Sequence, residues 1–253
     1  MDYSKLMDTA ILAGEIMLKS GAESYRVEGT MNYILKTSNL ETTEAFAITT
    51  GLVATLDDPK IDAITIVKRI QNRDTNLNKI YEVNIISRNL SAGTLALDDA
   101  YLALKGIKDA QYKTWVKNVA IIVLVASFAL LLGGGFLEVA AAGIDGVFLV
   151  FAVEIGKKIG MSSIIRNLIS SACVAIGATL LRKFFILNLN VDIVIVATIM
   201  PLVPGTAITN AIRDTLQGDY MSGGAKTLEA FVIAFSIALG IGIGLVIMGG
   251  GKF

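Results

Sequence analysis

Uncharged stretches long enough to cross a bilayer occupy much of the second half of this sequence and constrain its fold more than any other feature. Three of them hold 20, 20 and 22 consecutive residues without Asp, Glu, Lys or Arg, between residues 117 and 138, 192 and 213, and 229 and 252. A membrane-spanning helix needs about 20 mostly apolar residues. Two further apolar segments, 138–156 and 166–181, are interrupted or shorter. The sequence predicts five transmembrane helices, near 116–134, 138–156, 163–182, 191–210 and 228–249.

Charge divides the chain near residue 117. Residues 1–117 hold 14 basic and 15 acidic side chains, whereas residues 118–253 hold 8 and 7. The first part therefore has the charge density of a soluble domain, and neither part has the positive excess typical of nucleic-acid binding. We expect a soluble domain over 1–114 and a transmembrane domain over 115–253.

Periodicity in the first part predicts a cytoplasmic α+β domain with about three antiparallel strands. Apolar residues at helical spacing run from Leu6 to Met17 and stop at Gly21. Residues rich in Thr, Val and Ile around a turn at Pro59 indicate strands. The expected elements after the first helix are a helix over 23–38, one strand or two strands broken near Gly51 over 42–56, a strand over 62–70, and helices over 77–90 and 94–110, the last leading into the first membrane span.

The orientation follows from the N-terminus and from loop charges. The first 21 residues are charged and amphipathic, without the apolar core of a signal peptide. With the N-terminal domain inside, the inner loops hold seven Lys or Arg and the outer segments three. We expect a multi-pass protein of the cell (plasma) membrane, in contact with the lipid bilayer, with its N-terminal domain in the cytoplasm and its C-terminus outside.

Missing residue types exclude several kinds of chemistry. Without histidine there is no Ser-His-Asp triad and no histidine zinc motif, and Cys173 alone forms neither an internal disulfide nor a cysteine metal cage. No phosphate-binding Gly-rich motif occurs either. We expect no cofactor, no metal and no enzymatic activity. A membrane-tethered enzyme or regulator acting through residues 1–114 stays open as an alternative, and so does a passive channel.

Two polar clusters mark the predicted cytoplasmic domain. One lies at the head of the second helix, and the other joins a strand end to a later helix. Capping and surface ion pairs are one explanation, since acids favour helix N-termini, and a functional contact surface is the other. The clusters are Glu23, Arg26 and Glu28, and Arg69, Arg73, Asn84 and Arg88.

The predicted fourth span contains two of the three prolines, Pro201 and Pro204. Proline removes a backbone donor and clashes with the preceding turn, so this helix is expected to kink or break. Broken helices at membrane depth need polar partners, and transporters use them as substrate sites. Thr206, Thr209 and Asn210 follow directly and favour a binding site over a simple packing kink.

Within the second predicted span, Asp145 is the informative position. A carboxylate there is costly and marks either a functional pathway or a residue satisfied by a neighbouring helix. In a chain without histidine it is the natural candidate for proton coupling. In the last span, Gly240, Gly242 and Gly244 offer a small-residue face for internal packing or for a subunit interface, including a homo-oligomer.

Three stretches resemble the threonine/serine exporter family, and the resemblance runs over nearly the whole chain. They are AGEIMLKSGAESYRVEGTM (13–31), RIQNRDTNLNKIYEVNIISR (69–88) and PLVPGTAITNAIRDTLQGDYMSGGAK (201–226). The third stretch is the most specific, because Pro-Gly, Thr-Asn-Ala-Ile-Arg-Asp and Gly-Asp-Tyr occur in order at the family's spacing.

The resemblance implies export of a small polar metabolite by a secondary transporter. The chain is similar to the longer subunit of a split, two-component form, which implies a small hydrophobic membrane subunit as partner. Fused members are associated with threonine and serine, and split members with dicarboxylates such as succinate. Carried over by position, Pro204 and Gly205 break the helix, Thr209 and Asn210 contact substrate, and Arg213, beside Asp214, attracts a carboxylate from the cytoplasmic mouth.

Overall fold

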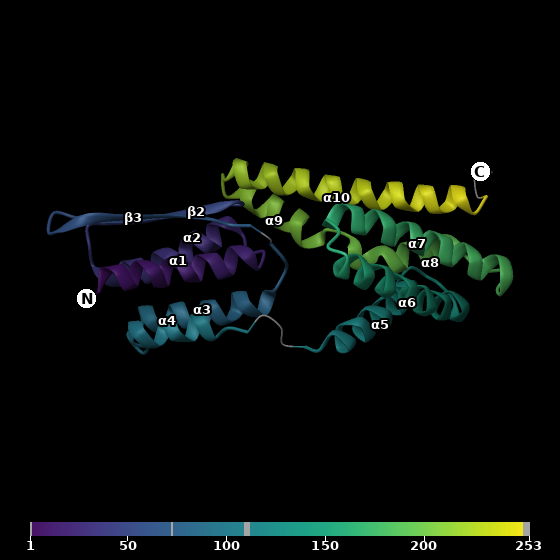
Figure 1. Ribbon diagram of the computed structural model, residues 1–253, viewed down its shortest axis with the longest axis horizontal. Helices are drawn as coiled ribbons and strands as arrows, with labels where there is room; N and C mark the ends of the chain where they lie inside the picture. Colours follow the sequence, from purple (N-terminus) through teal and green to yellow (C-terminus); the bar gives the residue numbers. More distant parts are fainter. Residues whose placement is uncertain (1, 72, 109–111, 250–253) are drawn as a thin grey trace. The chain divides into compact units, whose positions relative to one another are not determined.

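The computed structural model describes residues 2–71, 73–108 and 112–249 and divides into two compact units (Figure 1). Unit 1 comprises Met1–Asp109 and Gly205–Leu228, and unit 2 comprises Ala110–Pro204 and Glu229–Phe253. This division differs from the domain boundary expected at residue 114. Residues 205–228, expected to belong to the transmembrane domain, pack with the N-terminal part of the chain.

Unit 1 is an α+β fold. Its sheet is antiparallel in the order β1-β2-β3, as expected. The predicted strand over 42–56 forms two strands that meet at Thr49 and Thr50. The elements are α1 (Tyr3–Lys19), α2 (Ser24–Leu35), a 3-10 turn η1 (Lys36–Ser38), β1 (Thr42–Ile48), β2 (Gly51–Asp58), β3 (Ile61–Arg69), α3 (Leu77–Ser91), α4 (Leu97–Gly106), α9 (Gly205–Leu216) and the first residues of α10 (Tyr220–Ile247).

The core of unit 1 lies between its sheet and its helices. In the central strand, Leu52, Ala54 and Leu56 alternate toward α1 and α2 and are buried. Helices α3 and α4 form a further layer on the other side of α1 and α2 (Figure 1). The opposite face of the sheet carries Phe46 and Val67, which are exposed in unit 1. The alternation of period two that predicted the strands therefore also separates the two faces of the sheet.

One predicted helix is wrong in its extent. Residues 94–110 were expected to continue into the first membrane span, but α4 ends at Gly106 and α5 begins at Thr114. Ile107 has an extended backbone, with φ −62° and ψ 117°, which stops the helical hydrogen bonding at this point. The first span is therefore a separate helix and not an extension of the soluble fold.

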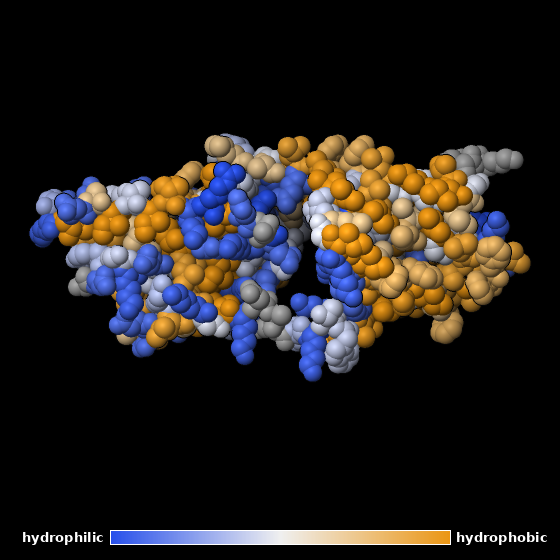
Figure 2. Space-filling view, viewed as in Figure 1, coloured by the Kyte–Doolittle hydropathy of each residue, from blue (hydrophilic) through white to orange (hydrophobic). Residues whose placement is uncertain are grey.

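Unit 2 is helical. Its elements are α5 (Thr114–Leu131), α6 (Phe136–Lys158), α7 (Ser163–Phe184), α8 (Val191–Ile199), a 3-10 turn η2 (Met200–Leu202) and the rest of α10. Within the described part of the chain, four helices (α5, α6, α7 and α10) are long and apolar enough to cross a membrane, or five spans if α8–η2 and α9 count as one broken span. Apolar side chains dominate the visible surface of these helices (Figure 2).

Small residues let the helices of unit 2 approach closely. The buried core is rich in alanine, including Ala141, Ala175 and Ala178. A Cβ placed on Gly146 of α6 would lie only 2.6 Å from a methyl group of Val125 in α5. Such packing is typical of membrane helices. In lipid, the helices associate through close van der Waals packing, which small side chains permit, because the hydrophobic effect does not drive them together.

Candidate functional site

The predicted fourth span is broken, as its prolines indicate. Helix α8 ends at Ile199, η2 follows, and α9 begins at Gly205. Pro201 and Pro204 have no backbone N–H, and Val203 between them is extended, with ψ 130°. The N–H of Val203 bonds to the carbonyl of Met200 at 3.2 Å, which closes the 3-10 turn. We call residues 203–204 the break.

After the break, α9 directs polar side chains toward the connection between α1 and α2. This connection, residues 20–24, is called the α1–α2 corner. Gly21 adopts φ +80°, and its N–H and that of Ala22 bond to the carbonyls of Leu18 and Met17, which forms a Schellman cap at the end of α1. The side-chain amide of Asn210 donates a hydrogen bond to the backbone carbonyl oxygen of Gly21 in this turn, at 2.7 Å.

Asp214 caps helix α2 from a distant part of the sequence. Glu23 occupies the N-cap position of α2 but makes no capping bond with its own side chain. The backbone N–H of Ser24 instead donates to Asp214 Oδ1 at 3.1 Å, and the Ser24 hydroxyl lies 3.4 Å from Oδ2. A carboxylate at this position satisfies an unpaired amide and interacts favourably with the helix dipole.

The charge of Asp214 is balanced by a buried lysine. Lys226 Nζ lies 2.6 Å from Asp214 Oδ2, and the two side chains are 5% and 0% exposed. The ammonium group also donates to the carbonyl of Ala22 at 3.4 Å. Asp214 and Lys226 therefore form a buried ion pair that joins α9 and α10 to the α1–α2 corner.

Of the first predicted polar cluster, Glu23 contacts α9. Its carboxylate accepts from Arg213 Nη1 at 2.5 Å, and Arg26 lies 3.8 Å away. Burial alone would raise the pKa of Glu23, but its own backbone N–H and the two arginines outweigh this, so the pKa lies below the ordinary value. The side chain of Arg213 stays 55% exposed despite this bond.

Glu28, in the same cluster, has a different role. Its carboxylate accepts from the backbone N–H of Ala47 at 2.9 Å and thereby joins α2 to β1. Burial raises the pKa of Glu28, and the N–H of Ala47 opposes this, while the negative charges of Asp219 and Asp214 raise the pKa further. Glu28 is thus held where its charged form is disfavoured.

The second predicted cluster is divided between separate contacts. Arg69 ends β3 opposite Gly51, and its side chain is exposed in unit 1. Arg88 of α3 lies over the ring of Tyr33 in α2, 5.4 Å from the centroid, in a cation–π contact. Arg73 follows β3 in the connection to α3, and Asn84 lies within α3. This cluster favours the packing explanation over a shared site.

The threonines of α9 lie on its exposed side. Thr209 donates to the carbonyl of Gly205 at 3.0 Å, and the Thr206 hydroxyl lies 3.3 Å from that of Thr75. Together with Arg213 they form the exposed polar face of α9, at positions i, i+3 and i+7. Of the residues expected to contact substrate, these three stay accessible, whereas Asn210 and Asp214 are already bonded to the α1–α2 corner.

In unit 2, the predicted coupling residue Asp145 is fully buried, at 0% exposure. It lies on α6, which packs against α7 and α8, and it interacts with Thr198, near the end of α8, and with Cys173 of α7. A Cβ on Gly177 of α7 would overlap the Asp145 carboxylate, so glycine there leaves room for the acid. Within the described residues, neither carboxylate oxygen of Asp145 has a hydrogen-bond partner.

Sequence reasoning missed Lys226, Ser24 and Thr198. Lys226 was counted only among the seven basic residues of the inner loops, although a lysine within an apolar helix is itself a signal for a charged partner. Ser24 and Thr198 carry no such signal, because serine and threonine are common in both helix caps and membrane helices. The role of Ser24 follows only from its contact with Asp214, and that of Thr198 only from its place beside Asp145.

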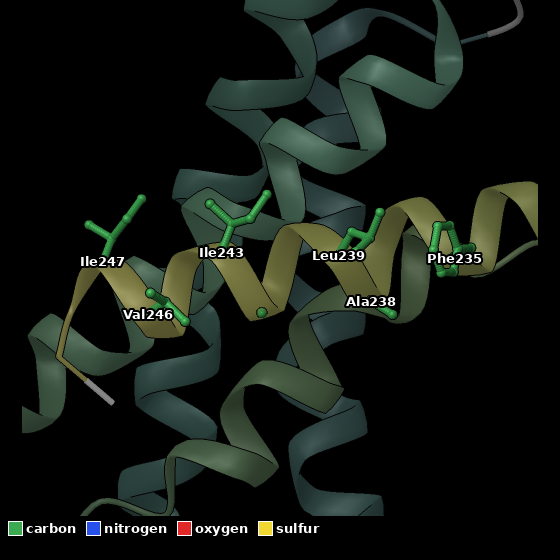
Figure 3. Close-up of a pocket in the computed structure, with 7 residues that line it drawn as sticks. Phe235, Ala238, Leu239, Ile243, Val246 and Ile247 are labelled. Atoms are coloured by element: carbon green, nitrogen blue, oxygen red, sulfur yellow. The ribbon is translucent and has the colours of Figure 1, made fainter. Parts of the chain in front are cut away.

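An apolar groove of about 470 Å³ runs along α10 (Figure 3). Every residue that lines it is apolar, so it offers no hydrogen bond to a polar metabolite and suits a hydrocarbon chain or another apolar helix. The lining residues are Phe235, Ala238, Leu239, Gly242, Ile243, Val246 and Ile247. Among the described residues, no group of three or more acidic or cysteine side chains is placed to hold a metal ion.

Comparison with known proteins identifies a family that this chain resembles over nearly its whole length. A sequence model of the family described as "Putative threonine/serine exporter" matches residues 8–248. The "Probable threonine/serine exporter" of Mycobacterium tuberculosis is 20% identical over 244 residues, which cover 95% of this chain and 46% of that protein. The "Threonine/serine exporter" of Corynebacterium glutamicum is 25% identical over 268 residues, covering 96% and 52%. The chain thus spans about half the length of these curated relatives. No solved structure matches it.

Proposed function

Because this chain belongs to the threonine/serine exporter family, we propose that it is a subunit of a secondary transporter that exports threonine or serine. The family predicted from the three sequence stretches is confirmed by the match over residues 8–248. The chain is a multi-pass membrane protein, with four helices that meet the length and hydropathy of a span, or five spans if α8–η2 and α9 count as one broken span. The observation that carries the transport proposal is this broken span.

The break supports a transport role because it frees backbone groups beside a polar helix face. Pro201 and Pro204 interrupt the helix, and the exposed Thr206, Thr209 and Arg213 follow at once. In a bilayer such a break is tolerated only against protein or water. We assign the exposed face of α9 to the first contacts with substrate, in which Arg213 attracts the carboxylate group.

A second substrate class fits the same face. Threonine, serine and dicarboxylates such as succinate all carry the carboxylate that Arg213 would attract. The hydroxyl oxygens of Thr206 and Thr209 can accept hydrogen bonds. They therefore favour an amino acid such as threonine or serine, whose hydroxyl and ammonium groups are hydrogen-bond donors. The names of the two relatives favour the same choice.

We further propose that unit 1 lies in the cytoplasm and that a small hydrophobic membrane subunit completes the transporter. The partner is carried over from the resemblance of the sequence to the two-component form of the family. Support for the orientation comes from the basic loops. A membrane-tethered enzyme or regulator is less well supported, because the carboxylates of unit 1 described above are used to join α2 to α9 and to β1.

Efflux from lipid vesicles tests the proposal. The full chain, purified alone and after co-expression with a small hydrophobic subunit of the family, is reconstituted with labelled threonine, serine or succinate inside. Saturable efflux of threonine or serine that accumulates against a gradient supports a secondary exporter. Flux that only equalises concentrations would indicate a channel, efflux of succinate alone would transfer the proposal to dicarboxylates, and the absence of flux for all three would contradict it.

A further inference from the structure

Among the described residues, Asp145 has neither a counter-charge nor a hydrogen bond donated to its carboxylate. Within the described residues, no basic side chain forms an ion pair with it, and its two oxygens accept no hydrogen bond. An isolated carboxylate is very costly in such surroundings. The neutral, protonated acid carries no such cost, so this is the form that the site accommodates without help from another ion.

Thr198 offers what a protonated Asp145 needs. The hydroxyl of Thr198 donates its single hydrogen to the carbonyl of Val194, at 2.8 Å, and so has none left for the carboxylate. Its oxygen keeps lone pairs that can accept. A protonated Asp145 would therefore donate to Thr198 Oγ1 and complete a chain of two hydrogen bonds that ends at the backbone of α8.

A metal ion fits this site less well than a proton. Hard cations are held by several oxygen ligands, as the six to eight around calcium illustrate. Among the described residues, the side-chain oxygen that interacts with Asp145 is the hydroxyl of Thr198, and the sulfur of Cys173 is the other interacting polar group. Ile122 and Val125, which face the next residue of α6 from α5, are apolar.

We propose that Asp145 and Thr198 form a proton-binding site of the membrane unit, through which proton movement drives the export proposed above. A proton from water adds to the carboxylate, and the new O–H group donates to Thr198. When Asp145 releases this proton to water, the Thr198 hydroxyl turns away from the Val194 carbonyl and donates its hydrogen to the carboxylate. Only the O–H bond of the acid is made and broken.

This exchange reaches the broken span directly. Thr198 is the second-last residue of α8, and η2 follows after Ile199. When the hydroxyl turns, the Val194 carbonyl loses a hydrogen bond in the last turns of α8. The charge state of Asp145 therefore changes the hydrogen bonding of the helix end at which the prolines act. Thr198 is a positioning residue in this scheme, and Asp145 holds the proton.

Infrared difference spectroscopy tests proton binding without transport. Spectra of the full chain in lipid, recorded in acidic and alkaline buffer, should show a protonated-carboxyl band that titrates in the wild type and is missing in Asp145→Asn. Thr198→Val should shift the band, and Thr198→Ser, which keeps the hydroxyl, should restore it. Gly177→Ala, whose methyl group presses on Asp145, should also shift it. Gly143→Ala is the matched control, because its Cβ meets only Ala126, at 4.0 Å.

Identical wild-type and Asp145→Asn spectra would overturn the proposal. In threonine-loaded vesicles, a pH gradient should stimulate threonine efflux by the wild type and not by Asp145→Asn. Stimulation equal to the wild type would likewise overturn it. Stimulation by a sodium gradient that Asp145→Asn abolishes would identify a sodium site instead. If no substrate moves in the wild type, the transport proposal fails, and the infrared band alone decides on the proton site.

Discussion

The carboxylate of Asp214 accepts a hydrogen bond from the backbone N–H of Ser24, a residue 190 positions earlier in the chain, at 3.1 Å. The same carboxylate binds Lys226, so a single buried group caps α2, neutralises a lysine and holds α9 at the α1–α2 corner. A helix that follows the break of a membrane span is thus an integral part of the α+β unit.

Removing the charge of Asp214 should destabilise the protein. Asp214→Asn leaves the ammonium of Lys226 buried without a counter-charge, which typically costs about 3–5 kcal/mol. The denaturation midpoint of the detergent-purified chain should fall, as measured by thermal unfolding. The double variant Asp214→Asn/Lys226→Met serves as control and should recover part of the loss, because it contains no unpaired charge. Equal midpoints for Asp214→Asn and the wild type would contradict the assignment.

Arg213 should act on substrate rather than through its bond with Glu23. Arg213→Ala removes a charge-assisted interaction worth about 1.5–3 kcal/mol, so the internal threonine concentration for half-maximal efflux should rise roughly tenfold or more. Glu23→Gln keeps Arg213 and should leave this concentration nearly unchanged. Vesicle efflux measured over a range of internal threonine concentrations makes the comparison. An equal rise in both variants would show that the ion pair, and not the substrate contact, is what matters.

Glu28 should make stability depend on pH in a specific direction. Burial raises its pKa above the ordinary 4.5, so the folded state favours the protonated form, and its contribution to stability is lost as the pH rises through that higher pKa. Glu28→Gln keeps an oxygen for the Ala47 N–H and carries no charge. Its midpoint should match the wild type in acid and exceed it at neutral pH. A difference that stays constant with pH would count against this role.

Two glycines of α10 should differ in their tolerance of a larger side chain. A Cβ on Gly240 would overlap the Ser171 hydroxyl and the Leu168 carbonyl of α7, whereas one on Gly242 meets nothing within 4 Å. Overpacking typically costs about 1–3 kcal/mol, so Gly240→Leu should lower the thermal midpoint in detergent. Gly242→Leu, which only fills the apolar groove, should leave it nearly unchanged. A loss of stability in both variants would show that both helix faces are packed.

Local patterns predicted the elements of the fold well. The strands followed from alternation and a turn at Pro59, and α6 and α7 from apolar runs bounded by charges, because both signals depend only on neighbours in sequence. The break after Ile199 also followed from local chemistry, since proline cannot continue a helix. The extension of α4 into α5 was wrong because helical periodicity around Gly106 does not reveal that the backbone of Ile107 is extended.

Long-range contacts in the site escaped prediction for a physical reason. Nothing in the periodicity of α9 indicates that Asp214 faces Ser24, and an ion pair with Lys226 requires the turn at Gly218 to bring α9 and α10 together. For Asn210 and Arg213, which stay predicted substrate contacts, the sequence also showed no sign of their hydrogen bonds to Gly21 and Glu23. Asp145 was identified because a carboxylate in an apolar helix is unusual on its own, whatever surrounds it.

The membership of α9 in unit 1 bears on the depth of the permeation barrier. If unit 1 lies in the cytoplasm, the chain has already returned to that side by Gly205, and Val191–Leu202 alone makes the fourth crossing. Its 9 residues of α-helix and 3 residues of 3-10 helix span only about 20 Å, whereas the hydrocarbon layer of a bilayer is about 30 Å thick. A crossing this short requires a thinned bilayer or water that enters from one side. Along this helix, a solute would leave water for only part of the membrane thickness.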